Sequence, residues 1–111
     1  MSEFETARQN MVDGQLRPTK VTDNRVLDVM GALPREMFVE KSRQGIAYVD
    51  EDIEVAPGRY LMEPVVLARL VQALDLTAAD SVLVIGAATG YDSALIGRIA
   101  GPVVAVESAD R

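Results

Sequence analysis

The stretch that decides the fold is Ser81–Glu107, which reads SVLVIGAATGYDSALIGRIAGPVVAVE. Its apolar residues at 82–85 predict a parallel strand covered on both faces, and Gly86 lets the backbone turn sharply into the helix that follows. A second strand is predicted over 103–106, parallel to the first, with Glu107 at its carboxyl end. This order of elements is typical of a nucleotide-type cofactor site, in which Glu107 could accept hydrogen bonds from a ribose diol. An adenosine-containing ligand is the first hypothesis.

The glycine loop after the first predicted strand discriminates between classes of nucleotide site. No lysine lies in it, which excludes a P-loop. A dinucleotide fingerprint needs a small sixth residue, where the bulk of Tyr91 opposes close packing of helix on strand. The G-x-G-x-G pattern of S-adenosylmethionine enzymes fits better, with Ala88 at the middle glycine; if that position has positive φ, alanine costs about 1 kcal/mol. The candidate cofactor-binding residues are Gly86, Ala87, Ala88, Gly90 and Glu107.

Charge and composition narrow the possible chemistry. The formal net charge is −6, and the eleven Lys and Arg residues are scattered along the chain, which argues against a nucleic-acid partner. Because the sequence has no Cys and no His, it offers no disulfide, no Cys-His or Ser-His nucleophile pair and no ordinary zinc site. Transfer chemistry that depends on positioning and charge placement remains open, and no metal is expected.

The N-terminus and the apolar runs bear on location. The first residues are polar and acidic, and they lack the basic flank and apolar stretch of a signal peptide. No apolar run approaches the length of a membrane span. We therefore expect a cytoplasmic protein with no membrane partner.

Short helices are predicted in the N-terminal part of the chain. Apolar spacing predicts a helix over 2–13 that ends near Gly14, and another that begins after Thr22 as N-cap and stops around Gly31. A further turn is expected over 34–39. Each piece is too short to be stable without a surface to cover, so together they predict a helical cap.

The middle of the chain is mixed, and a strong helix follows it. Short extended segments or loop are expected over 46–57, where the acidic residues indicate a solvated face and lack the turn glycine of a calcium loop. After Pro64, which suits a first helical turn, an amphipathic helix is predicted. Its apolar stripe consists of Val66, Leu67, Leu70, Val71 and Leu74.

Several short motifs follow one another in a characteristic order: MVDGQLR at 11–17, RVLDVM at 25–30, PREMFV at 34–39, Ala47-Tyr48, and the stretch 82–91. In this the chain resembles the protein-L-isoaspartate O-methyltransferase family. The resemblance implies a Rossmann-like enzyme that uses S-adenosylmethionine to methylate the free carboxylate of isoaspartyl residues in damaged proteins, which initiates their repair. The acceptor is then a protein or peptide carboxylate. With a pKa of about 4, this carboxylate is ionised at neutral pH and needs no general base to activate it.

Three positions depart from the family pattern. Met62 stands where the family's hydroxyl usually helps to hold substrate, and a thioether cannot donate a hydrogen bond. No catalytic residue is therefore assigned, but Arg59 is a candidate partner for the substrate carboxylate, the alternative being a surface arginine with no catalytic part. Val84 replaces the family's acid before the glycine loop, and Ala88 replaces its middle glycine.

The resemblance also implies a fold class and a division of the chain. We expect an α/β, Rossmann-like methyltransferase fold that is incomplete here. Residues 1–80 are its helical cap region, and 81–111 form its first β-α-β unit. Two parallel strands alone expose unpaired edges, so we expect a C-terminal half or a partner chain to complete the sheet.

Two other functions remain open. The chain could be a non-catalytic relative that keeps the fold as a binding or interaction module, which Met62 and Val84 favour. It could also be an NAD-dependent oxidoreductase, but this requires Tyr91 to be tolerated at the close-packing position.

Overall fold

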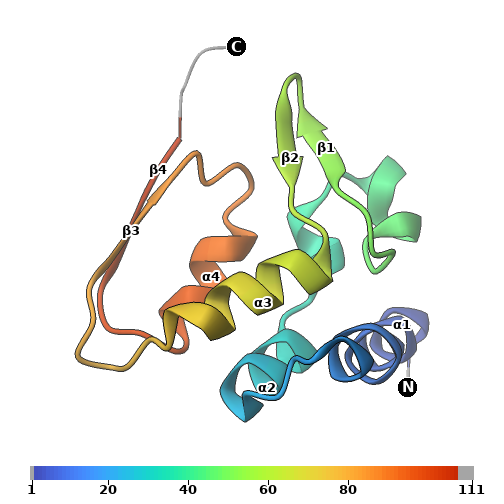
Figure 1. Cartoon of the computed structure of the whole chain (residues 1–111). Helices are drawn as coiled ribbons and strands as arrows, with labels where there is room; N and C mark the ends of the chain where they lie inside the picture. Colours follow the sequence, from blue (N-terminus) through green and yellow to red (C-terminus); the bar gives the residue numbers. More distant parts are fainter. Residues whose placement is uncertain (1, 108–111) are drawn as a thin grey trace.

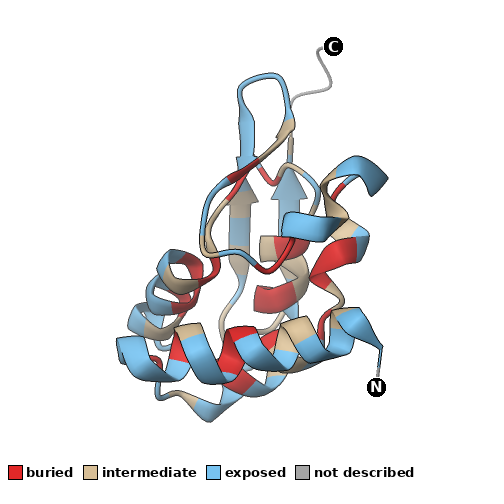
Figure 2. Cartoon of the chain, turned by 90° about the vertical axis from the view of Figure 1, so that its right-hand side faces the viewer, coloured by how far each residue is buried: buried red, intermediate tan, exposed pale blue. Residues whose placement is uncertain are grey.

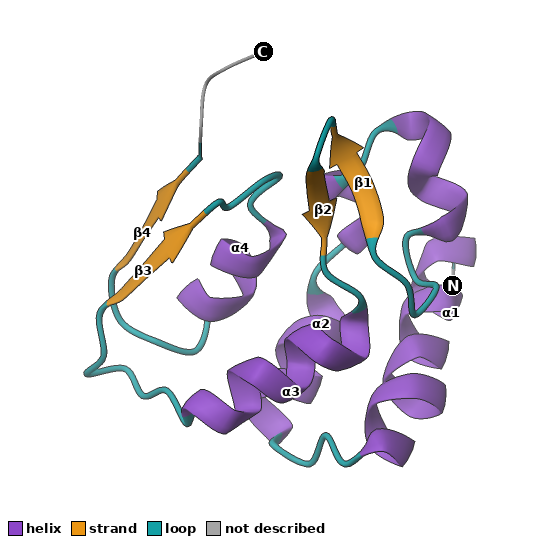
Figure 3. Ribbon diagram, turned by 45° about the horizontal axis from the view of Figure 1, so that its top comes forward, coloured by secondary structure: helices purple, strands orange, loops and turns teal. Residues whose placement is uncertain are grey.

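The two strands that frame the glycine loop form a parallel pair, as the sequence predicts. The computed structural model describes residues 2–107, and in it β3 (Val82–Ile85) and β4 (Val103–Val106) pair from Val82 opposite Val103 to Ile85 opposite Val106. The amides of Gly86 and Ala87 both donate to the Val106 carbonyl, at 2.8 and 3.1 Å, and so extend the pairing into the loop. Helix α4 (Tyr91–Gly97) connects the strands and packs on one face of the pair (Figure 3).

The other face of this strand pair is uncovered, so the expectation of a strand buried on both faces is wrong for the described residues. Side chains alternate across a strand, and only one of the two faces meets α4. Neither strand contains a fully buried residue (Figure 2). The outward face is formed by Leu83, Ile85, Val104 and Val106, whose exposed fractions are 60, 79, 60 and 50%.

Three helices and a hairpin form the rest of the molecule (Figure 1). The helices are α1 (Glu3–Met11), α2 (Asn24–Ala32) and α3 (Pro64–Leu74). The hairpin pairs β1 (Ile53–Ala56) with β2 (Arg59–Leu61) in antiparallel register. Shorter helical turns are η1 (Val12–Leu16), η2 (Arg17–Thr19), η3 (Arg35–Phe38) and η4 (Lys41–Ile46). The core gathers Met11, Leu16, Met30, Ile53, Leu67, Val71, Tyr91 and Leu95.

The first helical segment runs further than the sequence predicts. Instead of ending near Gly14, it continues as η1 and η2 to Lys20, whose φ of 70° ends it in the left-handed region. The continuation buries Leu16 completely, and Pro18 is tolerated because it lies at the start of the short turn η2. None of the helices within residues 2–107 is both long and apolar enough to cross a membrane.

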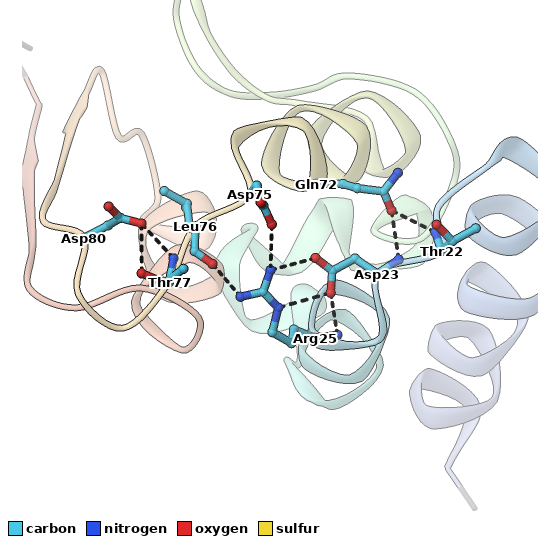
Figure 4. Close-up of polar contacts among 8 residues, drawn as sticks. All are labelled: Thr22, Asp23, Arg25, Gln72, Asp75, Leu76, Thr77 and Asp80. Carbon is cyan, nitrogen blue, oxygen red and sulfur yellow. Dashed lines mark hydrogen bonds and ion pairs between the residues drawn. The ribbon is translucent and has the colours of Figure 1, made fainter.

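Polar side chains join the start of α2 to the end of α3 (Figure 4). The N-cap of α2 is Asp23 and not Thr22, since the Asp23 Oδ1 atom accepts the Arg25 amide hydrogen bond at 2.9 Å. The amides of Thr22 and Asp23 are held instead by Gln72 Oε1 on α3, at 2.8 and 2.9 Å. Arg25 adds an ion pair to Asp75 and a hydrogen bond to the Leu76 carbonyl. Its hydrogen bond to Asp23 also lowers the pKa of that carboxyl.

The acidic run before the hairpin is more than the solvated face expected from the sequence. Asp52 accepts the Glu63 amide at 2.8 Å, and Asp50 accepts the Val65 amide at 3.1 Å. Both amides lie at the beginning of α3, where N–H groups lack partners within the helix. These two carboxylates therefore fix the start of α3 against the segment that precedes β1.

Candidate functional site

The glycine loop leaves β3 at its carboxyl end and turns through three left-handed positions. The φ angles are +70° at Gly86, +54° at Ala88 and +91° at Gly90. A Cβ atom built on either glycine meets nothing within 4 Å, so glycine is required there by backbone conformation and not by crowding. Ala88 adopts the strained conformation that the sequence anticipated for the middle position of the pattern.

Glu107 closes the loop from the end of β4. Its Oε2 atom accepts a hydrogen bond from the Ala88 amide at 2.6 Å. The sequence placed this residue near the loop as a ribose ligand, and the structure brings the two together. In the described residues the carboxylate is oriented by the loop backbone, at the edge where both strands end.

Arg59 also reaches this edge, from the β1–β2 hairpin. Its Nε atom donates to Glu107 Oε1 at 3.0 Å, while its side chain remains 48% exposed. Its two Nη groups make no hydrogen bond within residues 2–107. The sequence singled out Arg59 and Glu107 for separate roles. It gave no sign that the two side chains, 48 residues apart, form an ion pair.

Met62 and Val84, two of the three departures from the family pattern, pack against the core. Both side chains are partly buried against the core. The carbonyl of Met62 accepts a hydrogen bond from Arg35 Nη2 at 2.9 Å, so its backbone is fixed although its side chain cannot donate. Val84 lies on the face of β3 that packs on the core, opposite the exposed Leu83 and Ile85.

A polar network around the buried Tyr48 was not predicted. The Tyr48 hydroxyl accepts hydrogen bonds from the Arg35 amide at 3.0 Å and from Arg8 Nε at 2.9 Å, and it donates to Glu36. Arg8 completes the network with an ion pair to Glu36 at 3.3 Å. The sequence signal was present in the motifs at 34–39 and Ala47-Tyr48, but these supported only the family resemblance.

Burial changes the acid–base properties of the first turn of α4. It raises the pKa of Tyr91 to about 12, so this hydroxyl stays protonated at neutral pH. It also raises the pKa of Asp92, although the nearby Arg35 acts in the opposite direction. Within residues 2–107, no group of three Asp or Glu side chains is arranged to hold a metal ion.

The pH dependence of stability should reveal the contribution of Glu36. Burial alone would raise the pKa of this carboxyl, but hydrogen bonds from Tyr48 and Arg8 together hold the pKa below its usual value. A depressed pKa stabilises the fold above the unfolded value of about 4.3, and this stabilisation is lost as the pH falls through the folded value. Urea unfolding of Glu36→Gln should show a loss of about 1 to 3 kcal/mol at pH 7 that shrinks below about pH 4. The exposed Glu51→Gln serves as control, and a loss independent of pH would contradict the assignment.

Ala88→Gly tests the strain in the loop. Glycine removes the Cβ penalty of about 1 kcal/mol at positive φ, although it also raises the conformational entropy of the unfolded chain, which lowers stability. Ala87→Gly is the matched control, because Ala87 is buried and is not among the residues with positive φ. Thermal unfolding should find Ala88→Gly more stable than Ala87→Gly by about 1 kcal/mol. The reverse order would mean that residue 88 does not adopt the left-handed conformation.

Comparison with known proteins gives a consistent result. The family model described as Protein-L-isoaspartate(D-aspartate) O-methyltransferase (PCMT) matches residues 6–111. The chain is 39% identical over 103 residues to protein-L-isoaspartate O-methyltransferase 2 of Anaeromyxobacter sp. (strain Fw109-5), covering 93% of this chain and 42% of the relative. It is 38% identical over 104 residues to the Koribacter versatilis (strain Ellin345) enzyme of the same kind, covering 94% of this chain and 47% of the relative. The chain thus spans less than half the length of these relatives.

Solved structures give the same picture. One protein-L-isoaspartate O-methyltransferase superposes with a TM-score of 0.78 at 27% identity, covering 92% of this chain and 34% of its own. A Plasmodium falciparum protein, described as a beta-aspartate methyltransferase in complex with S-adenosyl-L-homocysteine, superposes with a TM-score of 0.66 at 16% identity. This second match covers 96% of this chain and 50% of the other, and it bears on the fold alone. The described α/β arrangement is therefore an incomplete Rossmann-like fold, and the chain belongs to the protein-L-isoaspartate(D-aspartate) O-methyltransferase family.

Proposed function

We propose that the complete protein is an S-adenosylmethionine-dependent carboxyl methyltransferase that acts on isoaspartyl residues of damaged proteins. The observation that carries the proposal is the placement of Glu107, a carboxylate held at the end of β4 against the Ala88 amide. Family membership supports it, because the relatives carry the name of this activity. The cytoplasmic location expected from the sequence belongs to the same proposal.

The chain's own residues suit this cofactor. Gly86, Ala87, Ala88 and Gly90 form a loop in which three positive φ angles turn the backbone at the strand ends. Glu107 offers acceptor oxygens for a ribose diol, the interaction proposed for it from the sequence. When bound, S-adenosylmethionine supplies a methyl group on a sulfonium, which an ionised carboxylate can attack directly.

The acceptor carboxylate needs orientation more than deprotonation, because it is ionised at neutral pH. Arg59 is the candidate to hold it. Its Nε atom donates to Glu107, which leaves both Nη groups to donate to a carboxylate at the same edge. In this arrangement one arginine links the ribose acid to the methyl acceptor. Met62 contributes no hydrogen bond from its side chain.

The uncovered face of the strand pair supports a further part of the proposal. Leu83, Ile85, Val104 and Val106 form an apolar surface of the kind that another element normally covers. Since the chain spans less than half the length of the relatives above, we propose that a C-terminal half or a partner chain covers this face and completes the sheet.

Calorimetry and a transfer assay test the proposal in sequence. Titration of the complete protein with S-adenosylmethionine and with S-adenosylhomocysteine should show saturable binding of both. Methyl transfer should then occur to an isoaspartyl peptide and not to the matching aspartyl peptide. Absence of binding would refute the proposed methyltransferase function. Binding without transfer to either peptide would favour the alternative, a non-catalytic binding module, for which the missing donor at Met62 is the supporting observation.

A further inference from the structure

Arg35 is the most deeply buried charged residue in the described structure. Its exposed fraction is 0%, and its side chain connects three separate segments. Nε donates to the Ala47 carbonyl, and Nη2 donates to the Met62 carbonyl at 2.9 Å. The guanidinium carbon lies 4.9 Å from the centre of the Tyr91 ring, within range of a cation–π interaction.

The cost of this arrangement argues for a role beyond filling space. Burial lowers the pKa of Arg35, which reports an unfavourable environment for its charge. Nη1 has no hydrogen-bond partner within residues 2–107, and neither has the Tyr91 hydroxyl. An apolar side chain of similar volume would pack without desolvating a cation. What such a side chain cannot do is hold two carbonyl groups and an aromatic face in a fixed relation.

Two of these three segments adjoin the sites proposed for the acceptor and for the cofactor. Met62 directly follows β2, which carries Arg59 at its start. Tyr91 directly follows the last glycine of the cofactor loop, and its ring also packs edge to face on Phe38 at 5.3 Å. Arg35 thus touches the backbone beside the proposed acceptor site and the residue beside the proposed cofactor site.

We propose that Arg35 is a positioning residue, which fixes the segment Arg59–Met62 relative to the loop Gly86–Tyr91 and so aligns the acceptor carboxylate with the cofactor. This inference rests on the proposed function. It assigns Arg35 no contact with either ligand. Its loss should therefore impair use of the acceptor peptide more than binding of the cofactor.

Arg35→Lys in the complete protein is the main variant, because lysine keeps the charge but lacks the fixed fork of donors. We expect its S-adenosylmethionine Kd to stay within about 3-fold of wild type, while kcat/KM for the isoaspartyl peptide falls about 10- to 100-fold. Arg35→Met should likewise leave the cofactor Kd nearly unchanged, with a larger fall in kcat/KM for the isoaspartyl peptide. Arg8→Met is the matched control, since Arg8 also contacts Tyr48 but, within residues 2–107, forms no hydrogen bond or ion pair with Met62 or Tyr91.

Amide hydrogen exchange gives a readout that does not depend on activity. Losing the bond to the Met62 carbonyl should speed exchange at residues 59–63 in Arg35→Lys, with exchange in β3 and β4 unchanged. Equal losses of kcat/KM in the Arg35 and Arg8 variants, or a parallel loss of cofactor affinity, would overturn the positioning role. So would unchanged exchange at 59–63. Failure of the wild-type protein to bind S-adenosylmethionine would instead refute the proposed function and leave the exchange result to decide on Arg35.

Discussion

Replacing Glu107 by alanine is expected to weaken S-adenosylmethionine binding by the complete protein about 10- to 100-fold. The change removes a carboxylate that could accept charge-assisted hydrogen bonds from the ribose, and each such bond contributes about 1.5 to 3 kcal/mol. It also releases the Ala88 amide, which Glu107 Oε2 holds at 2.6 Å, and so loosens the loop against which the cofactor should lie. Calorimetric titration measures the affinity directly.

Two further variants separate the causes of that loss. Glu107→Gln keeps an oxygen that can accept the Ala88 amide but removes the charge, so its affinity should lie between those of wild type and Glu107→Ala. Arg59→Met keeps Glu107 and removes the arginine that braces it, and it should affect the acceptor peptide more than the cofactor. Glu51→Ala, an exposed acid on the approach to the hairpin, controls for net charge. If Glu107→Ala binds as tightly as this control, Glu107 is not the ribose acid.

The elements that the sequence predicted correctly are those set by local pattern. The apolar runs at 82–85 and 103–106 form β3 and β4, and the helix predicted after Pro64 forms as α3. The stripe predicted for that helix is only partly right, because Leu67 and Val71 are buried whereas Val66, Leu70 and Leu74 are exposed. The left-handed conformation of Ala88 follows from the glycine pattern around it. In each case the cause lies within a few residues of its effect.

The features that the sequence did not predict depend on contacts between distant segments. Nothing near Arg59 or Glu107 indicates that they form an ion pair, because the hairpin and β4 are brought together only by the fold. The N-cap of α2 is Asp23 and not Thr22, and the amides of both residues donate to Gln72 of α3, a contact across 49 and 50 residues that the local sequence does not indicate. Arginine side chains are usually exposed, yet Arg35 is fully buried between three segments.

The exposure of one face of β3 illustrates a different limit of prediction from the sequence. A continuous apolar run predicts burial on both faces, since parallel strands normally lie between two layers. Burial of both faces of a strand, however, requires a second layer as well as an apolar run. Within residues 2–107 only α4 packs on the pair, so Leu83 and Ile85 remain exposed.

Gly101→Ala is expected to destabilise the protein by about 2 to 4 kcal/mol, from overpacking together with the loss of a hydrogen bond. Gly101 lies between α4 and β4, and its amide donates to the Asp80 carbonyl at 2.8 Å. A Cβ atom there would lie 2.6 Å from the carbonyl oxygens of both Ala78 and Asp80. Because both contacts are to backbone, no side-chain rotation can relieve them.

Urea unfolding of the complete protein measures this loss, and Gly14→Ala is its matched control. A Cβ at Gly14 meets nothing within 4 Å, and the residue lies inside the helical turn η1, so alanine there should leave stability unchanged or raise it by up to about 1 kcal/mol. Gly101→Ala should also weaken cofactor binding, since a shift of the segment 78–80 moves the start of β3 against β4, and the cofactor loop and Glu107 follow these two strands. Equal unfolding midpoints for the two variants would mean that this close approach of the backbone does not anchor the strand pair.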